Sequence, residues 1–281
     1  MRELSRSGMI ERSIIRKFRK TLWNPFVAGV KRYELIQAGD KIAVCMSGGK
    51  DSALLAKLMQ ELYRHSDVPF ELRFIVMDPG YDTEIRRQIK ENAALLDIPA
   101  LYFNSDIFQK VLKMKGAPCY MCARMRRGHL YGYAQELGCN KIALGHHFND
   151  AVETVLMGML YGAQIQTMMP KLRSRNFQGM ELIRPLYCVR EDDILAWARY
   201  NSLAFIQCAC PLAQGGAACG GSKRQEVKEL LGQLRRGDGD VENRIFQSVH
   251  KVNLDTVIGY KQGGKDYTFL DRYDMPRGEE L

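Results

Sequence analysis

A short polar segment directly follows the apolar run 42–46, and its residues are Ser47, Gly48, Gly49, Lys50, Asp51 and Ser52. A helical pattern of leucines begins just after it, so the segment joins a buried strand to a helix. Backbone N–H groups and the positive end of the helix dipole then converge on one point, which suits a phosphate group. Lys50 adds a positive charge, and Asp51 can hold a Mg²⁺ ion that bridges phosphates.

The segment is not a Walker A loop. That motif requires a glycine where Val44 stands and a serine or threonine where Asp51 stands. The alternative interpretation is a Ser/Gly turn with two solvated charges, and the flanking strand and helix argue against it.

Eight cysteines provide a second source of chemistry. Cys119 and Cys122 form a CxxC motif, which alone fits half a zinc site, a redox pair or part of an iron–sulfur site. Further thiols follow at Cys208, Cys210 and Cys219. Four thiolates would make a zinc site, whereas the CxxC with one more would hold a cluster and leave one iron open. The other three cysteines lie in or beside apolar segments and are expected in the core: Cys45, Cys139 and Cys188.

The segment 145–150, Gly-His-His-Phe-Asn-Asp, closes an apolar run and opens a helical pattern. Asp150 can stabilise the start of that helix or hold Mg²⁺ facing the loop at Ser47. The paired histidines invite a zinc interpretation. Adjacent side chains point in different directions, however, so we expect a surface or supporting role for this pair.

Strand and helix patterns alternate from residue 39 onward, which predicts an α/β fold with a parallel sheet covered on both faces. The expected strands are Lys41–Met46, Glu71–Met77, Ala100–Phe103 and Lys141–Leu144, and the expected helices 52–65, 84–96, 123–137 and 150–161. Ligands of such sheets bind at the carboxyl ends of the strands, where Ser47, Asp78 and Gly145 lie.

The remaining segments are expected to decorate this sheet. We predict a hairpin within 168–183, a helix at 191–201, a strand at Leu203–Gln207 and a helix at 222–235, with a loosely ordered tail after Gly259. The chain then divides into a basic helical extension (1–38), a central domain (39–220), and a C-terminal helix and tail (221–281). Pro25 is expected to divide the N-terminal extension into two helices.

Bulk composition narrows the class of protein. The hydrophobic content of 46% is that of a packed globular protein, and no apolar stretch is long enough to span a membrane. With no signal-like N-terminus, a cytosolic protein is expected. The net charge of +9 favours a polyanionic partner, and residues 1–38 hold nine basic and three acidic residues, hence six of those charges. That extension either contacts RNA phosphates or presents a solvated face.

Four segments resemble the tRNA cytidine 2-sulfurtransferases, a family of PP-loop ATP pyrophosphatases with the loop signature SGGxDS. They are Ser47–Ser52, the stretch from Cys119 and Cys122 through Arg124–Gly128, Lys141–Asp150, and Ile183–Leu186. Enzymes of this family adenylate the 2-oxygen of an anticodon-loop cytidine in tRNA and replace it with sulfur. The nearest alternatives are a PP-loop enzyme acting on another base or a small molecule, and a non-catalytic zinc protein that binds RNA.

The resemblance implies a Rossmann-like PP-loop ATPase core that uses ATP, Mg²⁺ and a [4Fe–4S] cluster. Its implied partners are tRNA, a sulfur donor such as a cysteine desulfurase and a second copy in a homodimer, without a membrane. The implied catalytic residues are Lys50, Asp51 and Asp150. The implied ATP-binding residues are Ser47, Gly48, Gly49, Lys50, Asp51, Ser52, Asp78, Gly145 and His146. The implied cluster ligands are Cys119, Cys122 and Cys208.

Two departures from the family pattern affect these assignments. Asn149 stands where the family has the first of two aspartates. The third cluster cysteine opens a short Cys-x-x-Cys-Gly-Ser segment in the family, and the equivalent stretch is longer here. Cys208 follows the predicted strand and is preferred, because a strand end fixes a ligand better than a glycine loop. Cys219, before Gly-Gly-Ser, and Cys210, on the same strand face as Cys208, remain alternatives.

Overall fold

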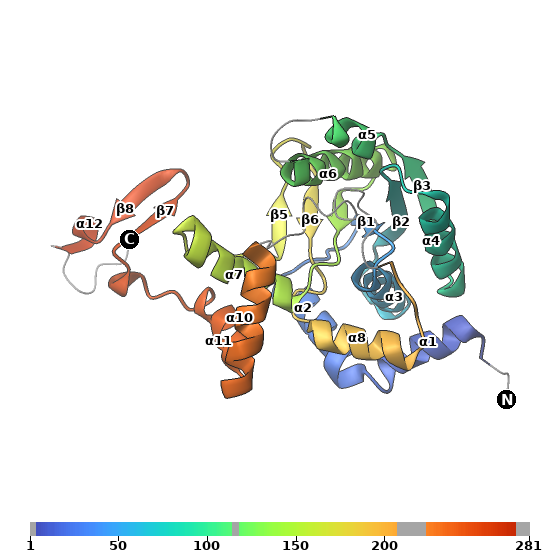
Figure 1. The fold of residues 1–281 in the computed structure, drawn as a ribbon, viewed down its shortest axis with the longest axis horizontal. Helices are drawn as coiled ribbons and strands as arrows, with labels where there is room; N and C mark the ends of the chain where they lie inside the picture. Colours follow the sequence, from blue (N-terminus) through green and yellow to red (C-terminus); the bar gives the residue numbers. More distant parts are fainter. Residues whose placement is uncertain (1–3, 114–117, 207–222, 274–281) are drawn as a thin grey trace.

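The computed structural model describes residues 4–113, 118–206 and 223–273, and its centre is a six-stranded sheet in the order β3-β2-β1-β4-β6-β5 (Figure 1). The strands are β1 Lys41–Met46, β2 Glu71–Asp78, β3 Ala100–Asn104, β4 Lys141–Ala143, β5 Lys171–Arg173 and β6 Glu181–Ile183. All pairings are parallel except that of β5 with β6, which forms the predicted hairpin. The expected Rossmann-like fold is confirmed, and the four predicted parallel strands are present to within one residue.

Helices connect and cover these strands. They are α1 Arg6–Ile15, the π-helix η1 Arg19–Trp23, α2 Asn24–Arg32, α3 Lys50–His65, α4 Thr83–Leu95, α5 Ile107–Leu112, α6 Pro118–Glu136, α7 Phe148–Gly162, α8 Glu191–Tyr200, α10 Lys223–Gly237, α11 Val241–Ser248, the 3₁₀ turn η2 Leu254–Thr256 and α12 Leu270–Tyr273. α5 and α11 were not predicted, since both are short. Pro25 stands at the predicted division, because η1 ends at Trp23 and α2 begins at Asn24. It lies in the first turn of α2, where its missing N–H leaves no bond unmade.

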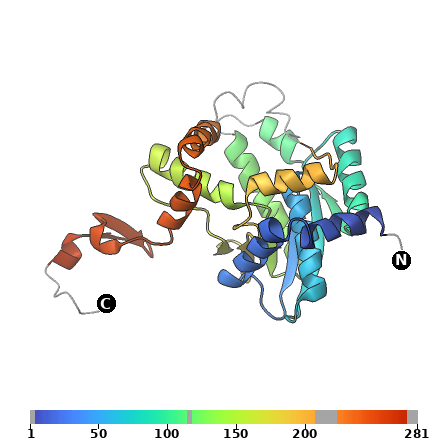
Figure 2. The same cartoon turned by 90° about the horizontal axis from the view of Figure 1, so that it is seen from below.

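The alternating side chains of β1 face two different layers. Ile42, Val44 and Met46 pack with α3, α8 and the N-terminal helices, whereas Ala43 and Cys45 pack with α6. This division follows from the two-residue period of a strand that is buried on both faces. Figure 2, viewed from below, shows α8 and the N-terminal helices lying together across the first face.

The N-terminal extension is part of the core. Ile10, Ile14, Leu22 and Phe26 are fully or almost fully buried. An ion pair also fastens α1 to α3, because the Lys57 ammonium has no solvent exposure and donates to Glu11 as well as to the Leu96 carbonyl, 2.7 Å away.

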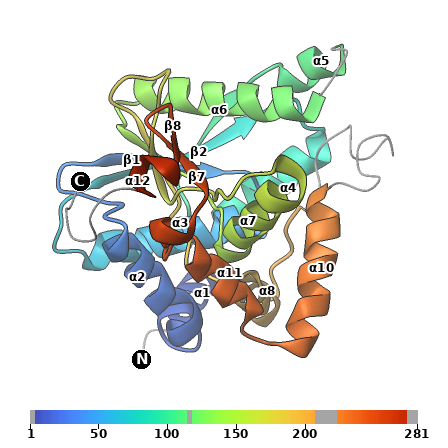
Figure 3. The ribbon, with the colours of Figure 1, turned by 90° about the vertical axis from the view of Figure 1, so that its left-hand side faces the viewer.

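A second group of helices packs at the other end of the sheet. α7, α10 and α11 share an apolar cluster in which Phe148 contacts Phe246, with ring centroids 4.7 Å apart. Figure 3 shows these three helices together. In the described part of the chain, no helix is long and apolar enough to cross a membrane.

Two predictions made from the sequence are wrong. Residues 203–206 form no strand and instead cross the carboxyl end of the sheet, where Phe205 stacks on Trp197 and the Ala204 carbonyl accepts a bond from Asn92. Leu203, Phe205 and Ile206 are half-buried by this packing, without any partner strand. The tail after Gly259 is ordered through residue 273, because β7 Gly259–Gln262 pairs with β8 Lys265–Thr268, and it projects from the body (Figure 1).

The buried pair between α1 and α3 yields a stability prediction. Glu11→Gln should lower the free energy of unfolding by about 3 kcal/mol, because the Lys57 charge stays buried without its carboxylate. Adding Lys57→Met should restore most of the loss, because no charge then remains to be desolvated. Urea unfolding of the two variants and the unaltered protein provides the measurement, and equal stability of single and double variants would contradict it.

Candidate active site

The predicted phosphate loop has the expected strand–turn–helix geometry. Gly48 adopts φ +84°, a left-handed conformation that favours glycine, and α3 begins two residues later at Lys50. The Ser52 hydroxyl accepts a hydrogen bond from the Ser47 N–H at 3.1 Å and donates to the Gly49 carbonyl at 3.0 Å. These bonds hold the turn closed, so the first N–H groups of α3 are available to a phosphate.

Gly145 allows the loop after β4 to press against the start of α3. A Cβ atom at this position would lie 3.1 Å from both the Asp51 carbonyl carbon and the Ser52 nitrogen. A side chain there would push apart the carboxyl ends of β1 and β4, the point where the strand order changes direction. Gly145 therefore acts through its small size and brings His146 next to the phosphate loop.

Lys50 lies between two carboxylates. Its ammonium is 2.9 Å from Glu191 Oε1 and 3.1 Å from Asp51. Burial alone would lower the pKa of Lys50, but the two negative charges raise it above its ordinary value, so the side chain stays protonated. Burial would conversely raise the pKa of Glu191, and the hydrogen bond from Lys50 instead brings it to about 2.

The two aspartates expected to bind magnesium differ in how their oxygens are used. Asp51 Oδ1 is buried and forms an ion pair with the Lys50 ammonium at 3.1 Å, but it has no further hydrogen-bond donor among the described residues. Asp150 Oδ2 accepts a bond from the His147 N–H at 3.0 Å, and its Oδ1 lies 3.3 Å from Arg224. Both Asp51 oxygens face the flexible end of the Lys50 side chain at 3.1 Å, whereas Asp150 is held by a backbone N–H and by Arg224. Asp51 is therefore the more available carboxylate, and Mg²⁺ commonly needs only one or two such groups beside phosphate oxygens.

The two histidines have separate roles. His147 bridges the aspartates, with Nε2 3.9 Å from Asp51 and Nδ1 3.5 Å from Asp150. His146 lines the neighbouring cavity, and its buried Nδ1 has no hydrogen-bond partner among the described residues. Burial, reinforced by the charge of Arg184, lowers the pKa of His146 to about 4, so the ring is neutral near pH 7. A neutral ring can exchange hydrogen bonds with a nucleobase.

Asp78 stabilises the turn after β2. Its Oδ1 accepts from the N–H groups of Gly80 and Tyr81, both at 2.8 Å, and its Oδ2 pairs with Arg86 at 2.5 Å. It does not line either cavity beside the phosphate loop. The structure thus places Asp78 near the strand ends, as expected, with both of its oxygens already engaged.

Charged residues that the sequence did not single out surround the site. Glu191, the first residue of α8, binds Lys50, and α10 contributes Arg224 and Lys228, which lie 3.4 and 3.6 Å from Glu153. Burial raises the pKa of Glu153 to about 7 despite these cations. The only available signal was the acidic run at the start of α8, residues 191–193, because contacts between distant segments leave no local pattern.

Asn149 has a positional role that explains its departure from the family pattern. Its Oδ1 accepts a bond from the Glu191 N–H at 2.9 Å, and its Nδ2 donates to the buried Glu242 at 3.3 Å. An aspartate here would place a carboxylate against Glu242, which is only 2% exposed. The amide can satisfy both neighbours, so it fixes the start of α8 and thereby Glu191.

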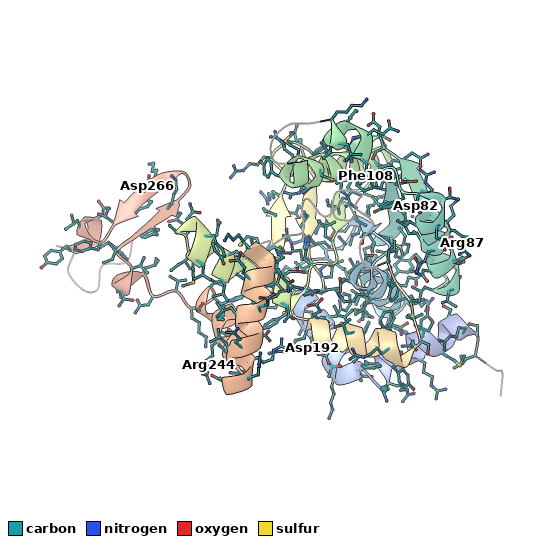
Figure 4. The ribbon with its side chains drawn as sticks, viewed as in Figure 1. Asp82, Arg87, Phe108, Asp192, Arg244 and Asp266 are labelled. Atoms are coloured by element: carbon teal, nitrogen blue, oxygen red, sulfur yellow. The ribbon has the colours of Figure 1, made fainter. Side chains whose placement is uncertain are left out.

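Two cavities adjoin at the phosphate loop. The larger, about 790 Å³, is lined by Lys50 and Glu191 and by apolar residues that include Phe108, labelled in Figure 4. The smaller, about 440 Å³, is lined by His146 and Asp150. Both contain Ser47, Asp51 and Arg126 in their walls. Two reactants can therefore meet at Asp51, each in its own cavity.

The cysteines are only partly described. Cys119 and Cys122 are the second and fifth residues of α6, a spacing of three that is typical of positions on one helix face. Cys122 is buried, whereas the Cys119 side chain and all of Cys208, Cys210 and Cys219 lie outside the described residues. Among described side chains, no three His, Cys, Asp or Glu are grouped for a metal. Cys45 and Cys139 are buried in the core as expected, and Cys188 is half-buried.

Comparison with known proteins agrees with this geometry. The family profile of the PP-loop domain matches residues 12–210. The tRNA-cytidine(32) 2-sulfurtransferase of Alcanivorax borkumensis is 36% identical over 93% of this chain and 95% of its own length, and that of Geobacter metallireducens is 34% identical over 84% and 91%.

The chain belongs to the tRNA-cytidine(32) 2-sulfurtransferase family of PP-loop proteins. Among solved structures, the U34-tRNA thiolase NcsA from Methanococcus maripaludis, solved with its [4Fe–4S] cluster, superposes with a TM-score of 0.64. It is 22% identical, and the match covers 84% of this chain and 82% of NcsA. That likeness confirms the fold of this family member.

The depressed pKa of His146 gives the folded protein a defined pH dependence. Unfolded chains protonate histidine below about pH 6.5, whereas folded His146 stays neutral to about pH 4. Above pH 6.5 the ring is neutral in both states and does not affect the free energy of unfolding. Between pH 6.5 and pH 4 only the unfolded chain binds the proton, so the free energy of unfolding falls as the pH drops. His146→Gln should reduce the stability loss between pH 7.5 and pH 5 by about 2 kcal/mol in urea unfolding.

His65→Gln, at the exposed end of α3, serves as the matched control. An unchanged pH dependence in His146→Gln would show that folding does not lower the pKa of His146.

Proposed function

We propose that this chain is an ATP-dependent tRNA sulfurtransferase that adenylates the 2-oxygen of a cytidine and replaces that oxygen with sulfur. The observation that carries the proposal is the meeting of two cavities at Asp51, one beside Lys50 and one beside His146. Membership of the family supports cytidine 32 of tRNA as the target. A cytoplasmic location fits such a substrate.

ATP binds with its phosphates on the loop 47–52. The backbone N–H groups at the start of α3 and the Lys50 ammonium contact the β- and γ-phosphates. The Asp51 carboxylate, which pairs with Lys50, would hold Mg²⁺. Before the nucleotide binds, the Lys50 ammonium forms an ion pair with Glu191. This ion pair keeps the ammonium in position, so little reorganisation is needed when phosphate oxygens approach.

The cytidine occupies the cavity beside His146. Its 2-oxygen attacks the α-phosphorus, a new P–O bond forms, and the bond to the bridging oxygen of pyrophosphate breaks. Lys50 and the loop N–H groups stabilise the charge on the departing pyrophosphate. Neutral His146 orients the base through Nδ1, and Arg126, which borders both cavities, neutralises the α-phosphate. The product is an adenylated base whose leaving group is AMP.

Cys119 and Cys122 fit two thiolate ligands of a [4Fe–4S] cluster, because they stand three residues apart at the start of α6, directly before Ala123, which lines the smaller cavity. Cys208 is proposed as the third ligand, with Cys210 and Cys219 as its competitors. The strand expected to end at Cys208 is absent over 203–206, so the preference now rests on the resemblance alone. When bound, such a cluster supplies the sulfide that displaces AMP. A sulfur donor such as a cysteine desulfurase and a homodimer are further parts of the proposal.

The phosphate loop provides the first test of the mechanism. Lys50→Ala and Asp51→Ala should each reduce tRNA-dependent pyrophosphate release by at least about 100-fold, because each removes a preorganised charge from the phosphates. Circular dichroism should report an unchanged fold. Lys90→Ala, an exposed lysine on α4, is the control. Normal pyrophosphate release in either loop variant would refute the ATP-site assignment.

The cysteines provide the test of sulfur transfer. In a strain lacking this gene, nucleoside analysis of tRNA should show loss of a thiolated cytidine, restored by the unaltered gene. Cys119→Ala, Cys122→Ala and Cys208→Ala should fail to restore it, and the proteins purified without oxygen should lose their iron. Iron retained in Cys208→Ala but lost in Cys210→Ala or Cys219→Ala would identify a different third ligand, and zinc in place of iron would exclude the cluster.

A further inference from the structure

A third cavity, about 710 Å³, lies between α6 and the β5–β6 hairpin, and its walls are rich in arginine. We call it the arginine groove. Its five arginines are Arg124, Arg127, Arg173, Arg175 and Arg184. No acidic residue is among the described residues that line it. Such an excess of one charge repels itself and attracts an anionic ligand.

The charges of the groove are only weakly neutralised by their surroundings. Arg173 is 92% exposed and lies 3.6 Å from Glu181, a distance and exposure at which an ion pair contributes little. The buried Nε of Arg184 has no hydrogen-bond partner among the described residues, although another of its nitrogens donates to the Met169 carbonyl. Burial and the nearby charge of Arg127 lower the pKa of Arg184 to about 10.

The groove is continuous with the active site. Ala123 and Arg127 border both the arginine groove and the cavity beside His146. A chain whose one nucleotide occupies that cavity would therefore place its adjoining phosphates among the arginines. A free nucleotide bound at Lys50 would not reach them, because the larger cavity shares no lining residue with the groove.

Aromatic rings accompany the arginines. Tyr120 lies at the groove, on α6, with 65% of its surface exposed. Tyr131 and Phe177 stack on each other across the groove wall, with centroids 5.1 Å apart, so their rings are already engaged. Exposed rings beside arginines are typical of sites that bind single-stranded RNA, where unstacked bases pack on aromatic faces.

We propose that the arginine groove binds the RNA backbone on either side of the target cytidine, and that Tyr120 stacks against a neighbouring unpaired base. The proposal rests on the proposed function, which makes the ligand a tRNA. An RNA loop is favoured over a duplex, because only unpaired nucleotides can give one base to the cavity and another to Tyr120.

The salt dependence of binding tests the arginines. Arg124 and Arg175 are exposed, lie outside the chemistry at Lys50 and Asp51, and are replaced together as Arg124→Gln and Arg175→Gln. The slope of log affinity for tRNA against log salt should become shallower by about one to two, since roughly one counterion is released per phosphate contact. The matched control, Arg87→Gln with Lys90→Gln, removes two charges from α4, on the far side from β5 (Figure 4), and should leave the slope unchanged.

The stacking contact is tested at Tyr120. Tyr120→Ala should weaken tRNA binding by about 5- to 100-fold without altering the salt slope, whereas Tyr120→Phe should bind like the unaltered protein. Both variants are compared at equal iron content, because the neighbouring Cys119 is a proposed ligand.

The outcomes separate this proposal from the proposed function. If the unaltered protein binds and thiolates tRNA but the Arg124/Arg175 variant keeps both affinity and slope, the groove assignment is wrong and the function stands. An unchanged tRNA affinity combined with weaker binding of the sulfur donor would assign the groove to that protein instead. Failure of the unaltered protein to bind tRNA would overturn both proposals.

Discussion

The close approach of two backbone segments organises the whole site. Gly145, after β4, lies against the first residues of α3, after β1, where even a Cβ atom would be crowded by backbone at 3.1 Å. β1 and β4 are neighbours in the sheet, and the strand order changes direction between them. The segments that follow these two strands therefore lead away to opposite sides and leave a crevice at the carboxyl ends. The phosphate loop forms one side of that crevice and the histidine segment the other. The functional side chains of both cavities are positioned relative to this contact.

Electrostatic balance is the second constraint. Lys50 is held by Asp51 and Glu191, and Glu191 is held in turn by Lys228, 3.4 Å away. Lys228 of α10 therefore supplies a positive charge that balances Glu191, in a site made mainly by α3, α7 and α8. Pairing offsets part of the desolvation cost of these charges, and it leaves a lysine already ionised and oriented. Both Asp51 oxygens lie 3.1 Å from the Lys50 ammonium, so a metal ion bound at Asp51 would share that carboxylate with Lys50.

The sequence predicted the features that depend on local order. A strand, a glycine turn and a helix follow one another within residues 41–65, so the order of residues alone is enough to identify the phosphate loop. Glu191 and Arg224 were missed, because Glu191 reaches Lys50 from 141 residues away along the chain and Arg224 reaches Asp150 from 74 residues away. Residues 203–206 were misassigned for a related reason. The side chains of Leu203 and Phe205 pack against the core over the strand ends. An apolar pattern alone cannot distinguish such packing from pairing in a sheet.

The β7–β8 hairpin shows that this chain does not have one uniform stability. Tyr260 and Tyr267 stack at 5.0 Å, and the described hydrogen bonds of residues 257–272 stay within the C-terminal segment. A two-stranded hairpin without a larger sheet is only marginally stable in water, so its amide protons should exchange with solvent through local opening. The amides of β1, covered on both faces, exchange only when the domain unfolds as a whole. The hairpin can therefore open and close many times during the lifetime of a single folded phosphate site.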